Sequence, residues 1–219
     1  MSGREAILAR IRQGLNRIEG DASAPARERA ETVERYLGTQ VEGLNTTHNG
    51  DLVARFTRCA IQLASTVEKV AAHAEVAAAV ARYLAKHKLP RNGICWPAFA
   101  DLDWAAQGLD MQARATSGTD LVGLTGAFCA IAETGTLMLL SGPNTPAATS
   151  LLPETHIAVL PLARIVASME QGWELLRREP GAMPRAVNFI SGPSRTADIE
   201  QTVTLGAHGP YRVHIILVA

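Results

Sequence analysis

Short, nearly uninterrupted apolar runs alternate with amphipathic segments from residue 51 to the end of the sequence. The runs predict strands over Thr66–Val70, Gly93–Trp96, Leu121–Leu124, Thr136–Leu140, His156–Leu160, Val187–Ile190 and Val213–Val218. Apolar residues spaced three or four apart predict helices over Leu52–Ala64, Glu75–Lys88 and Ile165–Arg178. Continuous apolar strands are typical of sheets that are covered on both faces. The alternation therefore predicts an α/β fold with a largely parallel sheet.

The first fifty residues follow a different pattern. One face of a predicted helix over residues 4–18 collects the apolar side chains of Leu8, Ile11, Leu15 and Ile18. Residues 20–50 are polar and interrupted by Gly, Ser, Pro and Asn, as is typical of a linker. We therefore expect a helical arm and linker over 1–50 and one α/β domain over 51–219. The arm could pack on its own domain or on a second subunit, and the short apolar stripe makes contact with a membrane the weaker alternative.

Charge and cysteine content narrow the classes of function. The 21 basic residues balance the 21 acidic ones, which gives no electrostatic footprint for nucleic acid. No apolar run reaches the ~18–20 residues that span a bilayer, and the N-terminus lacks the apolar centre of a secretory signal. We expect a cytoplasmic protein without a membrane span. The cysteines, Cys59, Cys95 and Cys129, lack the close spacing of metal-cluster ligands, which favours reduced thiols over a metal site.

A first candidate for chemistry is the turn at Glu133-Thr134-Gly135-Thr136. Glu133 lies between the apolar stretches Ala127–Ala132 and Leu137–Leu140, so its carboxylate needs hydrogen-bond donors. The neighbouring threonines can supply hydroxyl groups, and the glycine permits a close approach of the backbone. The alternative is an ordinary turn at the start of a strand with a solvated Glu133.

A second candidate is the polar corner after Val187–Ile190, which reads Ser191-Gly192-Pro193-Ser194-Arg195-Thr196 and continues to Glu200. Either Thr196 or Asp198 can cap a following helix, which would explain part of this polarity structurally. The free N–H groups of such a helix also bind anions, and Arg195 would add a fork for a carboxylate or phosphate. Both interpretations remain open on these residues alone.

A third candidate is the loop Gly206–Pro210 before the last strand. Its glycines and proline shape a tight loop around His208, which could serve as an acid–base group or a ligand contact. A metal site of Asp198, Glu200 and His208 is disfavoured, because side chains two apart on a helix point to different faces. The sequence contains no dinucleotide fingerprint, phosphate-binding loop or nucleophile elbow.

The segments AIAETGTLML, LLPETHIAVLP, SGPSRTADIEQTVTLGAHGP and VHIILV closely resemble the LUD-domain family of lactate-utilisation proteins, in its short form without iron–sulfur motifs. The resemblance covers roughly residues 51–219. It implies a three-layer α/β fold like that of sugar-phosphate isomerases, glucosamine-6-phosphate deaminase and coenzyme A transferases. No catalytic residues are carried over from the family, and those of this chain stay unknown. The candidate pocket comprises the motif positions and Arg195: Glu133, Thr134, Gly135, Thr136, Ser191, Gly192, Pro193, Ser194, Arg195, Thr196, Asp198, Glu200, His208 and Gly209.

The resemblance also implies a function, oxidation of L-lactate to pyruvate together with iron–sulfur partner proteins. With three scattered cysteines this chain cannot hold a four-cysteine cluster, so we expect a non-redox subunit without a cofactor of its own. The alternatives are a stand-alone enzyme acting on a small anionic or phosphorylated metabolite, and a regulatory or scaffold protein. Homo-oligomerisation stays open. If the pocket exists, Glu133, Ser191, Asp198 and Glu200 should line one cavity.

Overall fold

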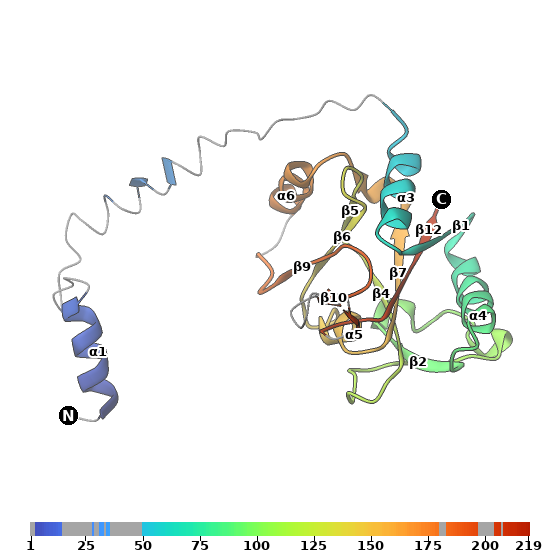
Figure 1. Cartoon of the computed structure of the whole chain (residues 1–219), viewed down its shortest axis with the longest axis horizontal. Helices are drawn as coiled ribbons and strands as arrows, with labels where there is room; N and C mark the ends of the chain where they lie inside the picture. Colours follow the sequence, from blue (N-terminus) through green and yellow to red (C-terminus); the bar gives the residue numbers. More distant parts are fainter. Residues whose placement is uncertain are drawn as a thin grey trace. The chain divides into compact units, whose positions relative to one another are not determined.

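The computed structural model describes residues 3–14, 28, 31–32, 34–35, 50–179, 183–196, 204–206 and 208–219. Its contacts divide the chain into two units, Met1–Leu44 and Asn45–Ala219. In the first unit, helix α1 spans Gly3–Gly14 (Figure 1). The predicted arm helix is thus present from residue 3 to 14, and residues 15–18 lie outside the described residues.

The second unit is built on a six-stranded, fully parallel sheet with the order β1-β12-β7-β4-β2-β3. Its strands are β1 (Thr66–Val70), β2 (Asn92–Cys95), β3 (Asp110–Ala113), β4 (Val122–Gly126), β7 (Thr155–Pro161) and β12 (Arg212–Val218). The mostly parallel central sheet and the α/β class are therefore confirmed. The pattern did not predict β3, in which only Met111 is buried.

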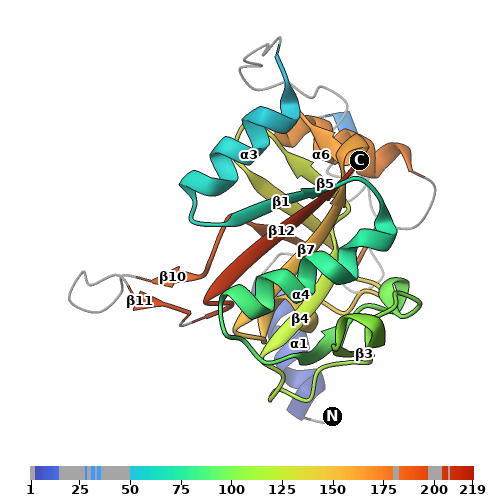
Figure 2. The same cartoon turned by 90° about the vertical axis from the view of Figure 1, so that its right-hand side faces the viewer.

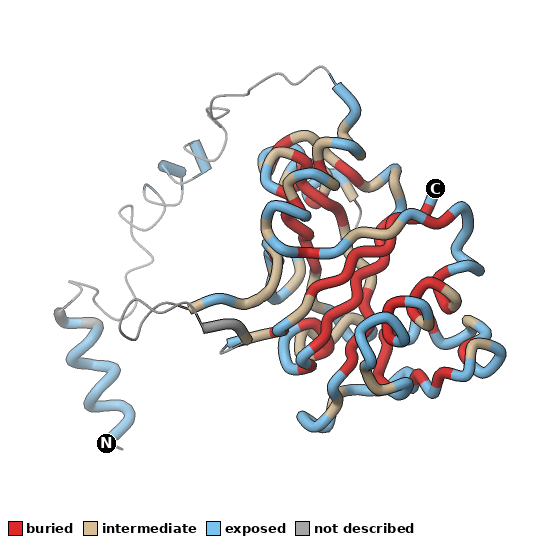
Figure 3. The backbone as a smooth tube through the Cα atoms, turned by 45° about the vertical axis from the view of Figure 1, so that its right-hand side comes forward, coloured by how far each residue is buried: buried red, intermediate tan, exposed pale blue. Residues whose placement is uncertain are grey.

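The apolar runs of the neighbouring strands β12 and β7 lie in the interior of the domain. Val213–Val218 of β12 is entirely buried, as is Thr155–Leu160 of β7 (Figure 3). Helix α4 (Val76–Lys86), preceded by a 3-10 turn at His73–Glu75, covers one side of this sheet (Figures 1 and 2). Its buried face includes Val80 and Leu84. Burial on both faces explains why these strands carry no alternating pattern.

A second sheet of four strands, with the order β8-β5-β6-β9, lies on the other side of the central sheet from α4 (Figure 1). Its strands are β5 (Cys129–Ile131), β6 (Thr136–Leu140), β8 (Ile165–Val166) and β9 (Val187–Ile190). β6 pairs antiparallel with both β5 and β9. Thr136–Leu140 and Val187–Ile190 are strands as predicted, but they belong to this mixed sheet and not to the parallel one.

The predicted helix over Ile165–Arg178 is wrong in its first part. Ile165 and Val166 form strand β8 against β5, and helix α6 begins only at Met169 and ends at Arg178. Ser168 caps the helix by accepting a hydrogen bond from the backbone N–H of Gln171. β-branched residues favour a strand, and a serine cap sets where the helix begins.

Helix α3 and several short segments complete the second unit. Helix α3 spans Leu52–Gln62, and Asp51 caps it by accepting from the backbone N–H groups of Val53 and Ala54. The remaining helical segments are α5 (Ala148–Leu151) and 3-10 turns at Pro97–Phe99, Ala105–Gln107 and Leu162–Arg164. A two-stranded hairpin joins β10 (Arg195–Thr196) to β11 (Thr204–Leu205). Within the described residues, no helix combines the length and apolarity that crossing a bilayer requires.

Candidate functional site

The Glu133 turn joins β5 to β6, and its carboxylate has a structural partner. Glu133 Oε1 accepts a hydrogen bond of 2.9 Å from the backbone N–H of Met169, the first residue of α6. A carboxylate at this position satisfies a free N–H group and interacts favourably with the positive end of the helix dipole. The contact explains how a charged residue is accommodated between two apolar strands.

Two glycines of the candidate segments bring their backbones against the end of helix α3. Gly135 has a φ of +70°, and a Cβ there would lie 2.4 Å from the backbone nitrogen of Ala60. Gly192 has a φ of +83°, and a Cβ there would lie 2.2 Å from the carbonyl oxygen of Leu63. Both positions therefore exclude side chains through conformation and through contact. The Glu133 turn and the Ser191 corner meet at the same helix end.

A chain of hydroxyl groups connects the turn to the corner. Thr134 Oγ1 donates to Thr136 Oγ1 over 2.8 Å, and Thr136 Oγ1 lies 2.8 Å from Ser191 Oγ. The antiparallel pairing of β6 with β9 places the start of one strand beside the end of the other. The structure therefore brings together two segments that are separated by more than fifty residues in the sequence. Thr136 is buried, whereas Thr134 and Ser191 are exposed.

Arg195 is exposed, and its guanidinium donates to the carbonyl oxygen of Leu63 over 3.3 Å. Leu63 is the C-cap of α3, so the cation lies at the negative end of that helix dipole. The expectation that Thr196 caps a helix is wrong, because Arg195 and Thr196 form strand β10. The carboxyl-end rule for parallel sheets does not apply to this corner either, since β9 pairs antiparallel with β6.

Ser194 connects the corner to the loop before β12. Its backbone N–H donates to Pro210 O, and its carbonyl accepts from Gly206 N–H, both over 2.9 Å. A Cβ at Gly209 would lie 3.3 Å from Ser194 Cβ, which shows how closely the two segments pack. Pro193 is half-buried and His208 is exposed. Asp198 and Glu200 lie outside the described residues, so their predicted place in a shared cavity stays a prediction.

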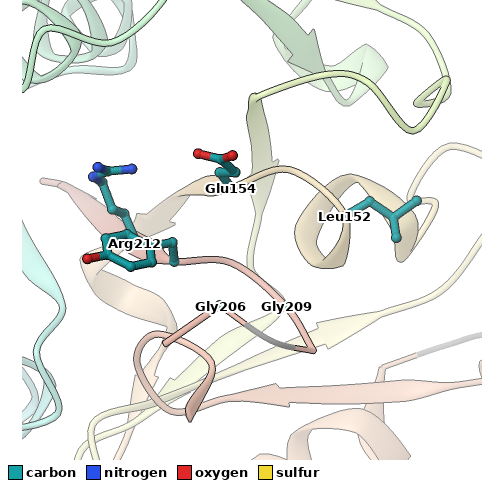
Figure 4. Close-up of a pocket in the computed structure, with 6 residues that line it drawn as sticks. Leu152, Glu154, Gly206, Gly209 and Arg212 are labelled. Carbon is teal, nitrogen blue, oxygen red and sulfur yellow. The ribbon is translucent and has the colours of Figure 1, made fainter. Parts of the chain in front are cut away.

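A cavity of about 390 Å³ opens at the amino ends of β7 and β12 (Figure 4). Its lining residues are Leu152, Glu154, Gly206, Gly209, Tyr211 and Arg212. Of the candidate positions that the structure describes, only Gly209 is among them. Sequence reasoning missed Glu154 and Arg212. Each of them directly precedes the buried run of a strand, β7 or β12. A charged residue immediately before such an apolar run was the sequence feature that could have identified them.

Two histidines are buried in the central sheet. His156 Nε2 lies 2.8 Å from Thr125 Oγ1, and burial lowers the pKa of His156 to about 3. His214 stacks on Tyr83 with 4.0 Å between ring centroids, and its Nδ1 lies 2.8 Å from Thr66 Oγ1. Burial is also the main cause that lowers the pKa of His214 to about 4. Both rings are therefore neutral at physiological pH and belong to the packed interior.

The three thiols differ in exposure. Cys95 and Cys129 are buried, and burial raises the pKa of both to about 11, whereas Cys59 is half-buried. Cys59 Sγ lies 3.7 Å from the carbonyl oxygen of Glu133. Across the described residues, no cluster of His, Cys, Asp and Glu side chains has the arrangement of a metal site.

Residues 97–218 match the LUD domain, and this match extends over more than half of the chain. The chain therefore belongs to the LUD-domain family. Lactate utilization protein C of Bacillus subtilis (strain 168) is 39% identical over 101 residues, which are 45% of this chain and 42% of that protein. The protein of that name from Exiguobacterium sp. (strain ATCC BAA-1283 / AT1b) is 42% identical over 100 residues, 44% of either chain. The matched part thus spans less than half the length of these relatives.

A solved structure has the same fold. The crystal structure of a DUF162 family protein from Deinococcus radiodurans superposes with a TM-score of 0.55 and 21% identity. The superposition covers 77% of this chain and 96% of that chain. At this identity the likeness concerns the fold alone, and it extends well beyond the segment that the sequence comparisons match.

Proposed function

We propose that this chain is a subunit of an L-lactate utilisation system and takes part in the oxidation of L-lactate to pyruvate. The observation that carries the proposal is the LUD domain over residues 97–218, together with 39–42% identity to proteins named lactate utilization protein C. We place the chain in the cytoplasm, where it works with iron–sulfur proteins that accept the electrons.

In this proposal the chain holds no iron–sulfur cluster of its own. A four-cysteine cluster needs one cysteine more than the three in the sequence. Cys95 and Cys129 also have pKa values raised to about 11, and a protonated thiol is a poor metal ligand. The clusters that receive the electrons of lactate are therefore assigned to the partner proteins.

The motif segments support a structural role for the polar corner within this function. Gly135, Gly192 and Arg195 all contact the C-terminal end of α3, and Glu133 binds the first N–H group of α6. These contacts fix two helices against the second sheet. The corner thereby holds Ser194 against the loop that borders the cavity.

Deletion of the gene in its native host tests the proposal. We expect loss of growth on L-lactate as sole carbon source, normal growth on pyruvate, and rescue by a plasmid-borne copy. Metal analysis of the purified chain should find no stoichiometric iron, and affinity capture from lactate-grown cells should recover iron–sulfur proteins. Normal growth of the deletion strain on L-lactate would refute the role in lactate utilisation. Stoichiometric iron would refute the non-redox assignment.

A further inference from the structure

The cavity at the amino ends of β7 and β12 is formed by segments that the backbone holds side by side. The backbone N–H of Arg212 donates to the carbonyl oxygen of Glu154 over 3.0 Å, directly before the two strands begin to pair. On the other side, the loop containing Gly206 and Gly209 is tied to Ser194 through two hydrogen bonds of 2.9 Å. The cavity is therefore bordered by segments that backbone hydrogen bonds hold together.

Opposite charges face this cavity without neutralising one another. Figure 4 shows the side chains of Glu154 and Arg212 rising on the same side of adjacent segments. Within the described part of the chain, neither residue takes part in an ion pair. The guanidinium of Arg212 is half-buried and lies over the ring of Tyr211, 4.8 Å from its centroid. Such stacking orients the planar guanidinium and leaves its N–H edge free for a ligand.

The two side chains together require a ligand that combines an anionic acceptor with a hydrogen-bond donor. An arginine fork binds a carboxylate through two parallel hydrogen bonds. An ionised glutamate only accepts hydrogen bonds, so it requires a donor on the same ligand. A phosphate dianion would bring negative charge close to Glu154, and a 2-oxo acid would offer it no donor. A small acid with a hydroxyl or an ammonium group on the carbon next to the carboxylate offers an acceptor to Arg212 and a donor to Glu154.

We infer that this cavity binds a small 2-hydroxy acid, with its carboxylate on Arg212 and its hydroxyl group donating to Glu154. The proposed function supplies L-lactate, so the choice of a hydroxy acid over an amino acid, and of lactate among the hydroxy acids, rests on that function. Arg212 and Glu154 are the specificity-determining residues of the site, because one recognises the carboxylate and the other distinguishes a hydroxyl from a keto group.

Calorimetric titration of the full chain with L-lactate, pyruvate and inorganic phosphate tests the assignment. Wild type should bind L-lactate about tenfold or more tightly than pyruvate, since the keto acid leaves Glu154 without a donor, and should bind phosphate more weakly than either. Arg212→Gln should weaken lactate binding about tenfold or more, and Arg212→Lys less, because lysine keeps the charge but loses the fork. Glu154→Gln should remove the preference for lactate over pyruvate.

Arg58→Gln is the matched control, because Arg58 is an exposed arginine of α3 and does not line the cavity. It should bind L-lactate as wild type does, and thermal melts should show all variants folded. Absence of lactate binding at millimolar concentration would overturn the inference. So would unchanged affinity in Arg212→Gln or an unchanged lactate preference in Glu154→Gln. If these tests fail while the deletion strain cannot grow on L-lactate, only the cavity assignment is wrong.

Discussion

Two buried, neutral histidines should make the α/β domain sensitive to mild acid. The folded-state pKa is about 3 for His156 and about 4 for His214, against an ordinary value of 6.5. Below pH 6.5 the unfolded chain binds a proton at each ring, whereas the folded chain does not. The free energy of unfolding is therefore fully present above pH 6.5 and decreases as the pH falls below that value. Between about pH 7.5 and 5, each histidine should cost about 2 kcal/mol, or about 4 together.

That loss is large against the ~5–15 kcal/mol by which domains are typically stable. The charged groups around His214 have opposing effects on the protonation of its ring. His87 and Lys86 disfavour protonation, whereas Glu68 Oε2 lies 4.0 Å from the imidazole Nε2 and would favour it. His156 lies deeper, and burial is the cause of its shift. It therefore gives the cleaner test.

The assay is urea denaturation at the two pH values, followed by the fluorescence of the buried tryptophans Trp96 and Trp104. His156→Gln removes the titrating ring and should reduce the pH-dependent loss by about half, to about 2 kcal/mol. The comparison is made within each variant, so a uniform destabilisation cancels. His208→Gln, at an exposed position, is the control. Equal pH-dependent losses in wild type and His156→Gln would refute the reasoning.

Four further outcomes follow from the contacts around helices α3 and α6 and from the thiols. Gly135→Ala should lower the free energy of unfolding by roughly 2 kcal/mol or more in urea titrations. Gly126→Ala is the control and should cost less than ~1 kcal/mol, because a Cβ at that position has ordinary contacts. Similar losses in the two variants would contradict the steric argument. Glu133→Gln should lower the free energy of unfolding by ~0.5–1 kcal/mol, because it removes a negative charge from the N-terminus of α6. This loss should shrink at high salt, and a loss that does not depend on salt would argue against the electrostatic cause. Arg195→Gln should lower stability by at most ~1 kcal/mol because the side chain is exposed, and a larger drop would indicate a buried ion pair. A thiol reagent should modify the half-buried Cys59 first and the two buried cysteines only on unfolding, and simultaneous labelling detected by mass spectrometry would contradict the described burial.

The local sequence pattern was sufficient to predict a strand where both of its faces meet the same environment. The run Val213–Val218 is buried on both faces, and it was recognisable as a central strand because no polar residue interrupts it except His214. Asp51 and Ser168 act as helix caps through side-chain contacts within three residues. Such interactions are local, although the apolar pattern over Ile165–Arg178 placed the start of α6 before its cap at Ser168. β3 was missed because a strand at the edge of a sheet with one buried residue leaves almost no apolar signal.

The candidate site shows the opposite case. The sequence marked Glu133 and Arg195 as unusual, but the carboxylate binds an N–H group of α6 and the guanidinium binds a carbonyl of α3. Arg195 reaches across 132 positions of the chain to Leu63. No periodicity encodes such a partner. The same holds for Thr196, which capping rules allow as a helix cap and which instead pairs with Thr204 as part of strand β10.

The sequence by itself determined the class of fold, most of the strands and the family, because burial on both faces of a parallel sheet imposes long apolar runs and because the motif segments are specific. Only the tertiary structure decided how the strands divide between two sheets. It also decided that Gly135 and Gly192 fit against one helix end and that Glu154 and Arg212 face one cavity. Those relations depend on which backbones approach each other in space. Contacts between residues far apart in the chain depend on the packing of the whole domain and leave no local pattern for sequence reasoning to find.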